Sequence, residues 1–238
     1  MIAVAACSET SGPGVASAIQ LFPLEVPSLV KGYPLTDTLG RPDSLHAVAY
    51  DSHGNPIASA PIRYFVIDTF KKIQVDSIRG TVMAVDTGSS RVIAEVGGLQ
   101  AQPLPITVVL APDSAFALDS TTDSLTYTFN GRDTAKALRI AVTHATFAVP
   151  SYRVEYQVTY PPGFTNTDSS LVLVVNASNQ PSLVDTTDAT GTGTRSLLIT
   201  PRTDTITDSV ALTVAAFLPD HTPVRGSPVH YLIHVKIR

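Results

Sequence analysis

The side chains with the clearest capacity for chemistry are aspartates that recur among serines and threonines. They form clusters at residues 119–123, 185–188 and 204–208. Calcium takes several oxygen ligands from loops, and the candidate ligands are Asp185, Asp188, Asp204 and Asp208. No cluster follows the continuous D-x-D-x-D-G pattern of a calcium loop, however, and Asp and Thr also cap turns by bonding to the adjacent backbone. The sequence therefore favours turns over calcium.

A second pattern is the histidine pair His230 and His234, which a β-strand would place on one face. Two imidazoles on one face are compatible with zinc. The alternating apolar residues Val229, Tyr231 and Ile233 predict that the histidines point away from the core, and no carboxylate or cysteine adjoins them in sequence. We expect surface histidines without a metal.

Patterns typical of enzymes are missing from the sequence. It contains no G-x-S-x-G elbow to present a serine nucleophile, and Gly191 and Gly193 form a lone pair with no helix after them to bind phosphate. The chain has no tryptophan to build the aromatic platform common in carbohydrate active sites. A net charge of -4 without a basic stripe excludes a nucleic-acid surface. We expect a protein that is not an enzyme and binds no cofactor or nucleic acid.

The most clearly patterned element is the segment 151–162, SYRVEYQVTYPP. Tyr152, Val154 and Tyr156 alternate with polar residues, and two prolines end the pattern, as expected of a strand with one buried face. A row of tyrosines would suit a sugar if it were exposed. Because the opposite face is polar, we expect the tyrosines in the core, with their phenol groups at its margin.

The remaining chain consists of short apolar runs separated by turn residues, without a sustained helical period. Expected strands lie at 21–30, 45–50, 62–67, 71–75, 80–85, 91–96, 104–110, 125–129, 136–142, 152–160, 170–175, 195–200, 209–216 and 229–237. Among them, 21–30 contains two prolines and suits a sheet edge, whereas 62–67 is a candidate core strand. The sequence predicts an all-β chain of two tandem immunoglobulin-like Greek-key β-sandwiches, at 21–111 and 112–238, joined by a short linker at 111–114 with a fairly fixed angle. Residues 87–89 are expected to form a turn.

The first half also carries a family resemblance. Residues 51–57 (DSHGNPI), 62–68 (IRYFVID), 80–101 (GTVMAVDTGSSRVIAEVGGLQA) and 105–110 (PITVVL) resemble a bacterial immunoglobulin-like (Big, or invasin-like) domain of the kind strung in tandem on adhesins and surface proteins. The stretch 181–201 resembles a hairpin of the same broad family more weakly. The resemblance implies a non-catalytic extracytoplasmic structural or interaction protein, an accessory or surface subunit that docks on a protein partner or larger membrane-associated assembly. The alternative it implies is a carbohydrate-binding or cell-adhesion module.

The start of the sequence is treated separately. Val4, Ala5 and Ala6 precede Cys7, the one cysteine, with the small-residue spacing of a lipoprotein processing site, although Met1 to Ala6 supplies neither a basic region nor a long apolar region. We expect residues 1–20 to be a flexible tail with Cys7 as a candidate lipidation site. This places the protein in the bacterial periplasm or on the cell surface, with the membrane as a further partner.

Overall fold

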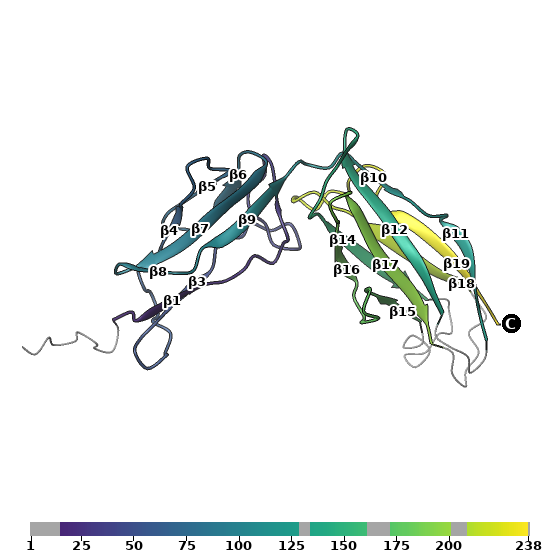
Figure 1. Cartoon of the computed structure of the whole chain (residues 1–238), viewed down its shortest axis with the longest axis horizontal. Helices are drawn as coiled ribbons and strands as arrows, with labels where there is room; N and C mark the ends of the chain where they lie inside the picture. Colours follow the sequence, from purple (N-terminus) through teal and green to yellow (C-terminus); the bar gives the residue numbers. More distant parts are fainter. Residues whose placement is uncertain (1–14, 129–133, 161–171, 201–208, 238) are drawn as a thin grey trace, which may run out of the picture.

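The computed structural model describes residues 15–128, 134–160, 172–200 and 209–237, and all regular elements within them are β-strands. Figure 1 shows the strands in two groups that follow one another along the chain. We call these the N-terminal and C-terminal sandwiches. None of the described residues belongs to a helix that could cross a membrane. The all-β architecture with two tandem sandwiches is confirmed.

The N-terminal sandwich contains the first nine strands. They are β1 (Ala18–Leu21), β2 (Leu29–Val30), β3 (Ala47–Tyr50), β4 (Arg63–Val66), β5 (Ile73–Val75), β6 (Val82–Ala84), β7 (Gly88–Val96), β8 (Leu99–Gln100) and β9 (Leu104–Val109). The main sheet has the order β2-β9-β7-β4, with β8 paired to β7. Two small sheets, β1-β3 and β5-β6, complete it, and the core between them contains Leu35, Ile73, Val92 and Ile106.

The C-terminal sandwich contains the other ten. They are β10 (Ser114–Ala117), β11 (Thr122–Tyr127), β12 (Thr134–His144), β13 (Phe147–Ala148), β14 (Arg153–Thr159), β15 (Val172–Val175), β16 (Val184–Thr186), β17 (Thr192–Ile199), β18 (Ser209–Ala215) and β19 (Val229–Ile237). One sheet has the order β10-β12-β17-β15, with β13 on β12, and the other has the order β11-β19-β18-β14-β16. Leu138, Val154, Leu197 and Leu212 are fully buried between them.

Both sandwiches close in a similar way. In each, an early strand pairs in parallel with the last strand: β2 with β9, where Leu29 faces Val108, and β11 with β19, where Thr122 faces Leu232. The last strand is in each case an apolar run that follows a proline. The last strand of the N-terminal sandwich, β9, therefore ends close to Ser114, where the C-terminal sandwich begins.

Four expectations about strands need correction. The predicted strand 21–30 is two strands, because Pro23 and Pro27 lie between β1 and β2 and neither can donate to a ladder. The predicted core strand 62–67 is β4, an edge strand in which Tyr64 alone is buried. Gly88, expected in a turn, begins β7, and Ser114, expected in the linker, begins β10.

One type of turn recurs through the molecule. We define the proline-closed turn as the six residues 37–42, 51–56, 176–181 and 218–223, in which the final proline forms a bridge with the residue before the turn. In each, the first residue donates its backbone N–H to the fifth carbonyl and accepts from the fourth N–H. The fourth residue is Gly40, Gly54, Asn179 or His221, and all four have positive φ. Left-handed backbone explains the preference for glycine or asparagine at this position.

Candidate functional site at the domain junction

The predicted calcium ligands are engaged elsewhere wherever the structure describes them. Asp185 on β16 forms an ion pair with Arg195 on β17, with 2.6 Å between Nη1 and Oδ1, and both side chains are largely buried. Asp188 accepts hydrogen bonds from the backbone N–H of Thr190 and Thr192 and from the Thr190 hydroxyl. Asp204 and Asp208 lie outside the described residues. Over the ranges that the structure covers, no three His, Cys, Asp or Glu side chains gather as a metal site would require.

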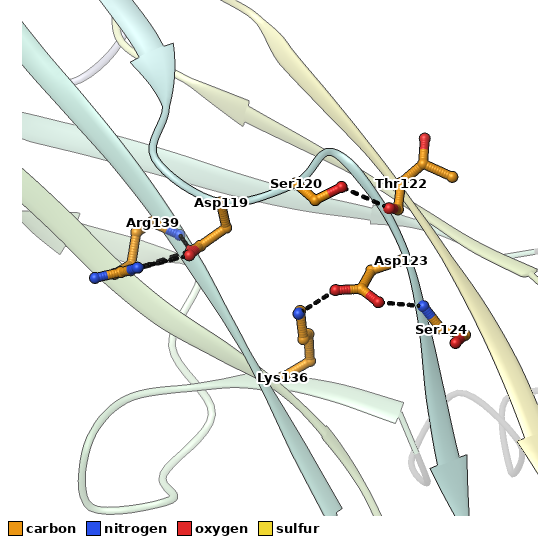
Figure 2. Close-up of polar contacts among 7 residues, drawn as sticks. All are labelled: Asp119, Ser120, Thr122, Asp123, Ser124, Lys136 and Arg139. Carbon is orange, nitrogen blue, oxygen red and sulfur yellow. Dashed lines mark hydrogen bonds and ion pairs between the residues drawn. The ribbon is translucent and has the colours of Figure 1, made fainter.

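The cluster at 119–123 shows the same use of carboxylates. Asp119 binds Arg139 of β12, with 2.7 Å between Nη2 and Oδ1, and Asp123 binds Lys136 of the same strand (Figure 2). The hydrogen bonds from Arg139 lower the pKa of Asp119, and those from Lys136 lower the pKa of Asp123. The Ser120 hydroxyl donates to the carbonyl of Thr122, at 2.7 Å. Asp119 thus ties the connection between β10 and β11 to β12, and Asp123 ties the start of β11 to the same strand.

The two other predicted groups lie where the sequence placed them. His230 and His234 are exposed on β19, while Tyr231 and Ile233 between them are buried. Their ring nitrogens contact hydroxyls of β18, since His234 Nδ1 lies 2.7 Å from Ser209 Oγ. The tyrosines of β14 belong to the core, as expected, because Tyr156 is 3% exposed and Tyr152, just before the strand, is 4% exposed. Burial raises the pKa of both, and the tyrosine row therefore offers no open platform for a sugar.

The feature that the sequence did not predict is the contact between the two sandwiches. Ser28, just before β2, is buried, and its hydroxyl donates to the carbonyl of Ser151 at 2.7 Å. Val30 and Val109 are both 5% exposed and pack into the core of the C-terminal sandwich. The Lys31 N–H binds the Val109 carbonyl at 2.8 Å. The core of the C-terminal sandwich thus extends onto β2 and β9, while the N-terminal sandwich keeps a separate core.

Two proline-closed turns, one from each sandwich, meet beside this core. A Cβ atom built on Gly40 would lie 2.9 Å from Cβ of His221 and 3.1 Å from the carbonyl oxygen of Pro219. Real Cβ atoms essentially never come within 3.0 Å of a heavy atom, so the approach to His221 Cβ would force one of the turns to shift. The imidazole of His221 is itself held by stacking on Phe217, with ring centroids 4.5 Å apart. The two backbones therefore touch at a point where only glycine fits.

A cavity of about 70 Å³ lies in the junction and is lined by both sandwiches. The charged groups around it have partners in their own sandwich: Asp37 binds Arg41, and Arg153 binds Glu155 with 2.9 Å between Nε and Oε1. The backbone N–H of Arg41 lowers the pKa of Asp37. The charged side chains Asp37, Arg153 and Glu155 that line the cavity thus form ion pairs within their own sandwich.

The comparisons with known proteins give structural likeness alone. No protein-family model matches the chain, and no curated protein matches its sequence. The chain is similar to domains 1-6 of the surface layer protein SbsC, with 13% identity, a TM-score of 0.35, and coverage of 94% of this chain and 28% of that one. For the Yersinia pseudotuberculosis adhesin InvE the values are 16%, 0.33, 90% and 58%. For the Clostridium thermocellum CbhA fibronectin(III)-like modules they are 11%, 0.36, 92% and 95%.

This chain thus spans less than two thirds of the SbsC and InvE structures. At such identities and TM-scores the similarities say nothing about a partner or an activity. One sequence signal points to the turn at the junction but not to its contact. The D-x-x-G-x-P pattern of 51–56 also occurs at 37–42, and it predicts a turn at both places.

Proposed function

We propose that this chain is a non-catalytic structural module of a bacterial extracytoplasmic protein, which holds two β-sandwiches at a fixed angle so that their outer surfaces present to partners in a set geometry. Its role is to space and orient, and a larger surface or membrane-associated assembly is the expected context. The aspartate clusters support a structural role. Their described carboxylates form ion pairs with Arg or Lys side chains, or accept backbone N–H groups within turns.

The observation that carries the proposal is the backbone contact between Gly40 and the turn at His221. Flexible tandem domains are joined by exposed linkers that few contacts cross. Here a buried hydroxyl bond, two core valines and a glycine contact all connect the sandwiches. Hinge motion would expose Val30 and Val109 to water and break the bond of Ser28, which opposes opening.

The anchor is a separate part of the proposal. Cys7 lies outside the described residues, and its lipidation rests on the small residues before it. Mass spectrometry of the N-terminal peptide from native membranes tests it. A diacyl or triacyl increment on Cys7 is expected, and an unmodified chain beginning at Met1 would contradict the anchor while leaving the spacing role intact.

Pulsed electron spin resonance tests the fixed angle. Spin labels are placed at Ser89→Cys and Ser178→Cys, one exposed residue in each sandwich, in a Cys7→Ser background. We expect a narrow distance distribution. Gly40→Ala should shift or broaden it, whereas Gly54→Ala should not, because a Cβ on Gly54 meets nothing within 4 Å although both glycines have the same positive φ. A broad distribution in the chain without glycine substitutions would refute the spacing role.

A further inference from the structure

The linker between the two sandwiches is stiff in its own backbone. It consists of residues 110–113, because β9 ends at Val109 and β10 begins at Ser114. Pro112 in its middle is buried. A proline fixes its own φ near about −65° and restricts the residue before it, here Ala111, to extended conformations. What remains to be fixed is the direction in which the peptide plane between Ala111 and Pro112 points.

His144, the last residue of β12, holds this peptide plane. Its Nδ1 atom lies 2.7 Å from the carbonyl oxygen of Ala111. Because a carbonyl oxygen only accepts, the hydrogen of this bond is on Nδ1. The same nitrogen lies 4.0 Å from Oδ2 of Asp113, which is too far for a hydrogen bond. His144 therefore makes one directed bond to the linker, and that bond attaches the Ala111 carbonyl to the C-terminal sandwich.

The hairpin of β12 and β13 makes two further bonds to the linker. The Asp113 N–H donates to the carbonyl of Thr143 at 2.9 Å, and Asp113 Oδ2 accepts from the Ala145 N–H at 2.6 Å. His144 faces Phe147 in the register, so Ala145 is the first residue of a two-residue loop at the tip of the hairpin. Three consecutive residues of the hairpin thus bond to one short connection.

The loop residue Ala145 has a backbone conformation that alanine disfavours. Its φ is 56°, in the left-handed region where a Cβ atom crowds the following carbonyl oxygen. Strain of this kind persists where the surrounding structure over-determines it, and it is often found at functional positions. The N–H of this same residue is the one that Asp113 binds. The hairpin is therefore held in a strained form in which it bonds to the linker.

We propose that His144 is the positioning residue of the junction, and that its bond to Ala111 sets the angle between the two sandwiches. The contacts of Ser28, Val30 and Gly40 join the bodies of the sandwiches, whereas His144 acts on the connection between them. Without its bond, the peptide plane at Ala111 is free to rotate against the C-terminal sandwich. This inference rests on the proposed spacing role and deepens it by naming the side chain that controls the angle.

The test measures the spin-label distances described above in variants of His144. His144→Ala removes the donor to Ala111 and should shift the mean distance or widen the distribution by about half, since relative motion is the default for tandem domains whose contacts are weakened. His144→Asn should restore the original distribution, because its amide nitrogen can take the place of Nδ1 and donate to the same carbonyl. The matched control is His234→Ala. The Nδ1 atom of His234 also lies 2.7 Å from an oxygen, Ser209 Oγ, but within the C-terminal sandwich, so this variant should leave the distances unchanged.

A second variant keeps the test independent of folding. The side chain of His144 is 41% exposed, and His144→Gln nearly preserves its volume while its amide reaches the position of Nε2 instead of Nδ1. We expect His144→Gln to change the distances as His144→Ala does, with circular dichroism unchanged.

Three outcomes would overturn the inference. They are unchanged distances in His144→Ala and His144→Gln, changed distances that His144→Asn does not restore, and an equal change in His234→Ala. A narrow distribution in the unmodified chain together with any of these rejects the positioning role of His144 while the spacing role stands. A broad distribution in the unmodified chain rejects the spacing role, and the inference falls with it.

Discussion

Two turns of the N-terminal sandwich, 37–42 and 51–56, are alike in almost every local respect. In both, Oδ1 of the first aspartate accepts backbone N–H groups two and four residues later. Asp37 accepts from Leu39 and Arg41, and Asp51 accepts from His53 and Asn55. The φ angles of Gly40 and Gly54 are 78° and 80°. Yet a Cβ atom on Gly40 would meet His221 of the other sandwich, whereas a Cβ atom on Gly54 would meet no atom within 4 Å.

One local sequence pattern therefore serves two purposes in this sandwich. Turn chemistry requires a short polar first residue and a left-handed fourth residue in both cases. At 51–56 that requirement is the whole role of the glycine. At 37–42 the same glycine also permits backbone contact with a turn more than 170 residues away, since its partner is His221. Local pattern specifies the turn, and the surface across from it decides its function.

The largest expected effect is a difference in stability loss when the glycine of each turn, Gly40 or Gly54, is replaced by alanine. Gly54→Ala introduces positive-φ strain alone and should reduce the free energy of unfolding by about 1 kcal/mol. Gly40→Ala has the same strain plus a clash with His221 and Pro219 and should cost about 3 kcal/mol. Urea denaturation measures both. Equal losses would mean that the junction contact contributes nothing.

The next effect tests whether Val30 of the N-terminal sandwich supports the core of the C-terminal one. Val30→Ala should destabilise by about 2 kcal/mol and speed amide exchange in β18 and β19, because Val30 packs into the C-terminal core. The control is Val108→Ala, whose residue is 2% exposed within the N-terminal core and should speed exchange in β7 instead. Faster exchange in β7 and not in β18 after Val30→Ala would show that Val30 supports the N-terminal core instead. Hydrogen exchange with mass spectrometry reads out both.

A smaller effect concerns the hydroxyl bond across the junction. Ser28→Ala leaves the carbonyl of Ser151 without this donor in a buried site, which should cost about 1 kcal/mol. Ser120→Ala removes a bond of the same length within one connection at the exposed surface and should change the free energy of unfolding by less than about 0.5 kcal/mol. Denaturation midpoints compare the two, and a neutral Ser28→Ala would argue that water replaces the bond.

The smallest effect is one in which the two turns should behave alike. Backbone hydrogen bonds lower the pKa of Asp37 and of Asp51 below their ordinary value of 3.8. These carboxylates therefore stabilise the fold above that pH, and their contribution is lost as pH falls through the folded pKa. Asp37→Asn and Asp51→Asn should each weaken the fall in stability between about pH 4 and pH 2 to a similar degree. Acid titration by circular dichroism tests this, and an acid transition that is as steep in the Asn variants as in the unmodified chain would contradict it.

Much of the fold was predictable from single segments. The alternation of 151–162 gives β14 with its buried tyrosines, the apolar run 229–237 is β19, and DSHGNP gives the turn at 51–56. Each is encoded by neighbours in sequence, through side-chain period or turn geometry.

The junction and the edge position of β4 could not be predicted in this way. Ser28 and Ser151 are 123 residues apart, and their contact depends on how two completed sandwiches meet. IRYFVI reads as a core strand because composition reports burial and not which neighbours a strand has in its sheet.

The central claim, that the two sandwiches form one rigid unit, is tested most directly by residual dipolar couplings of backbone amides in one weakly aligning medium. Couplings from β7 and β9 and from β17 and β19 are fitted to separate alignment tensors in the frame of the structure. The account predicts tensors of equal magnitude and orientation for the two sandwiches. Tensors of unequal magnitude would show that the sandwiches move independently, and would contradict it.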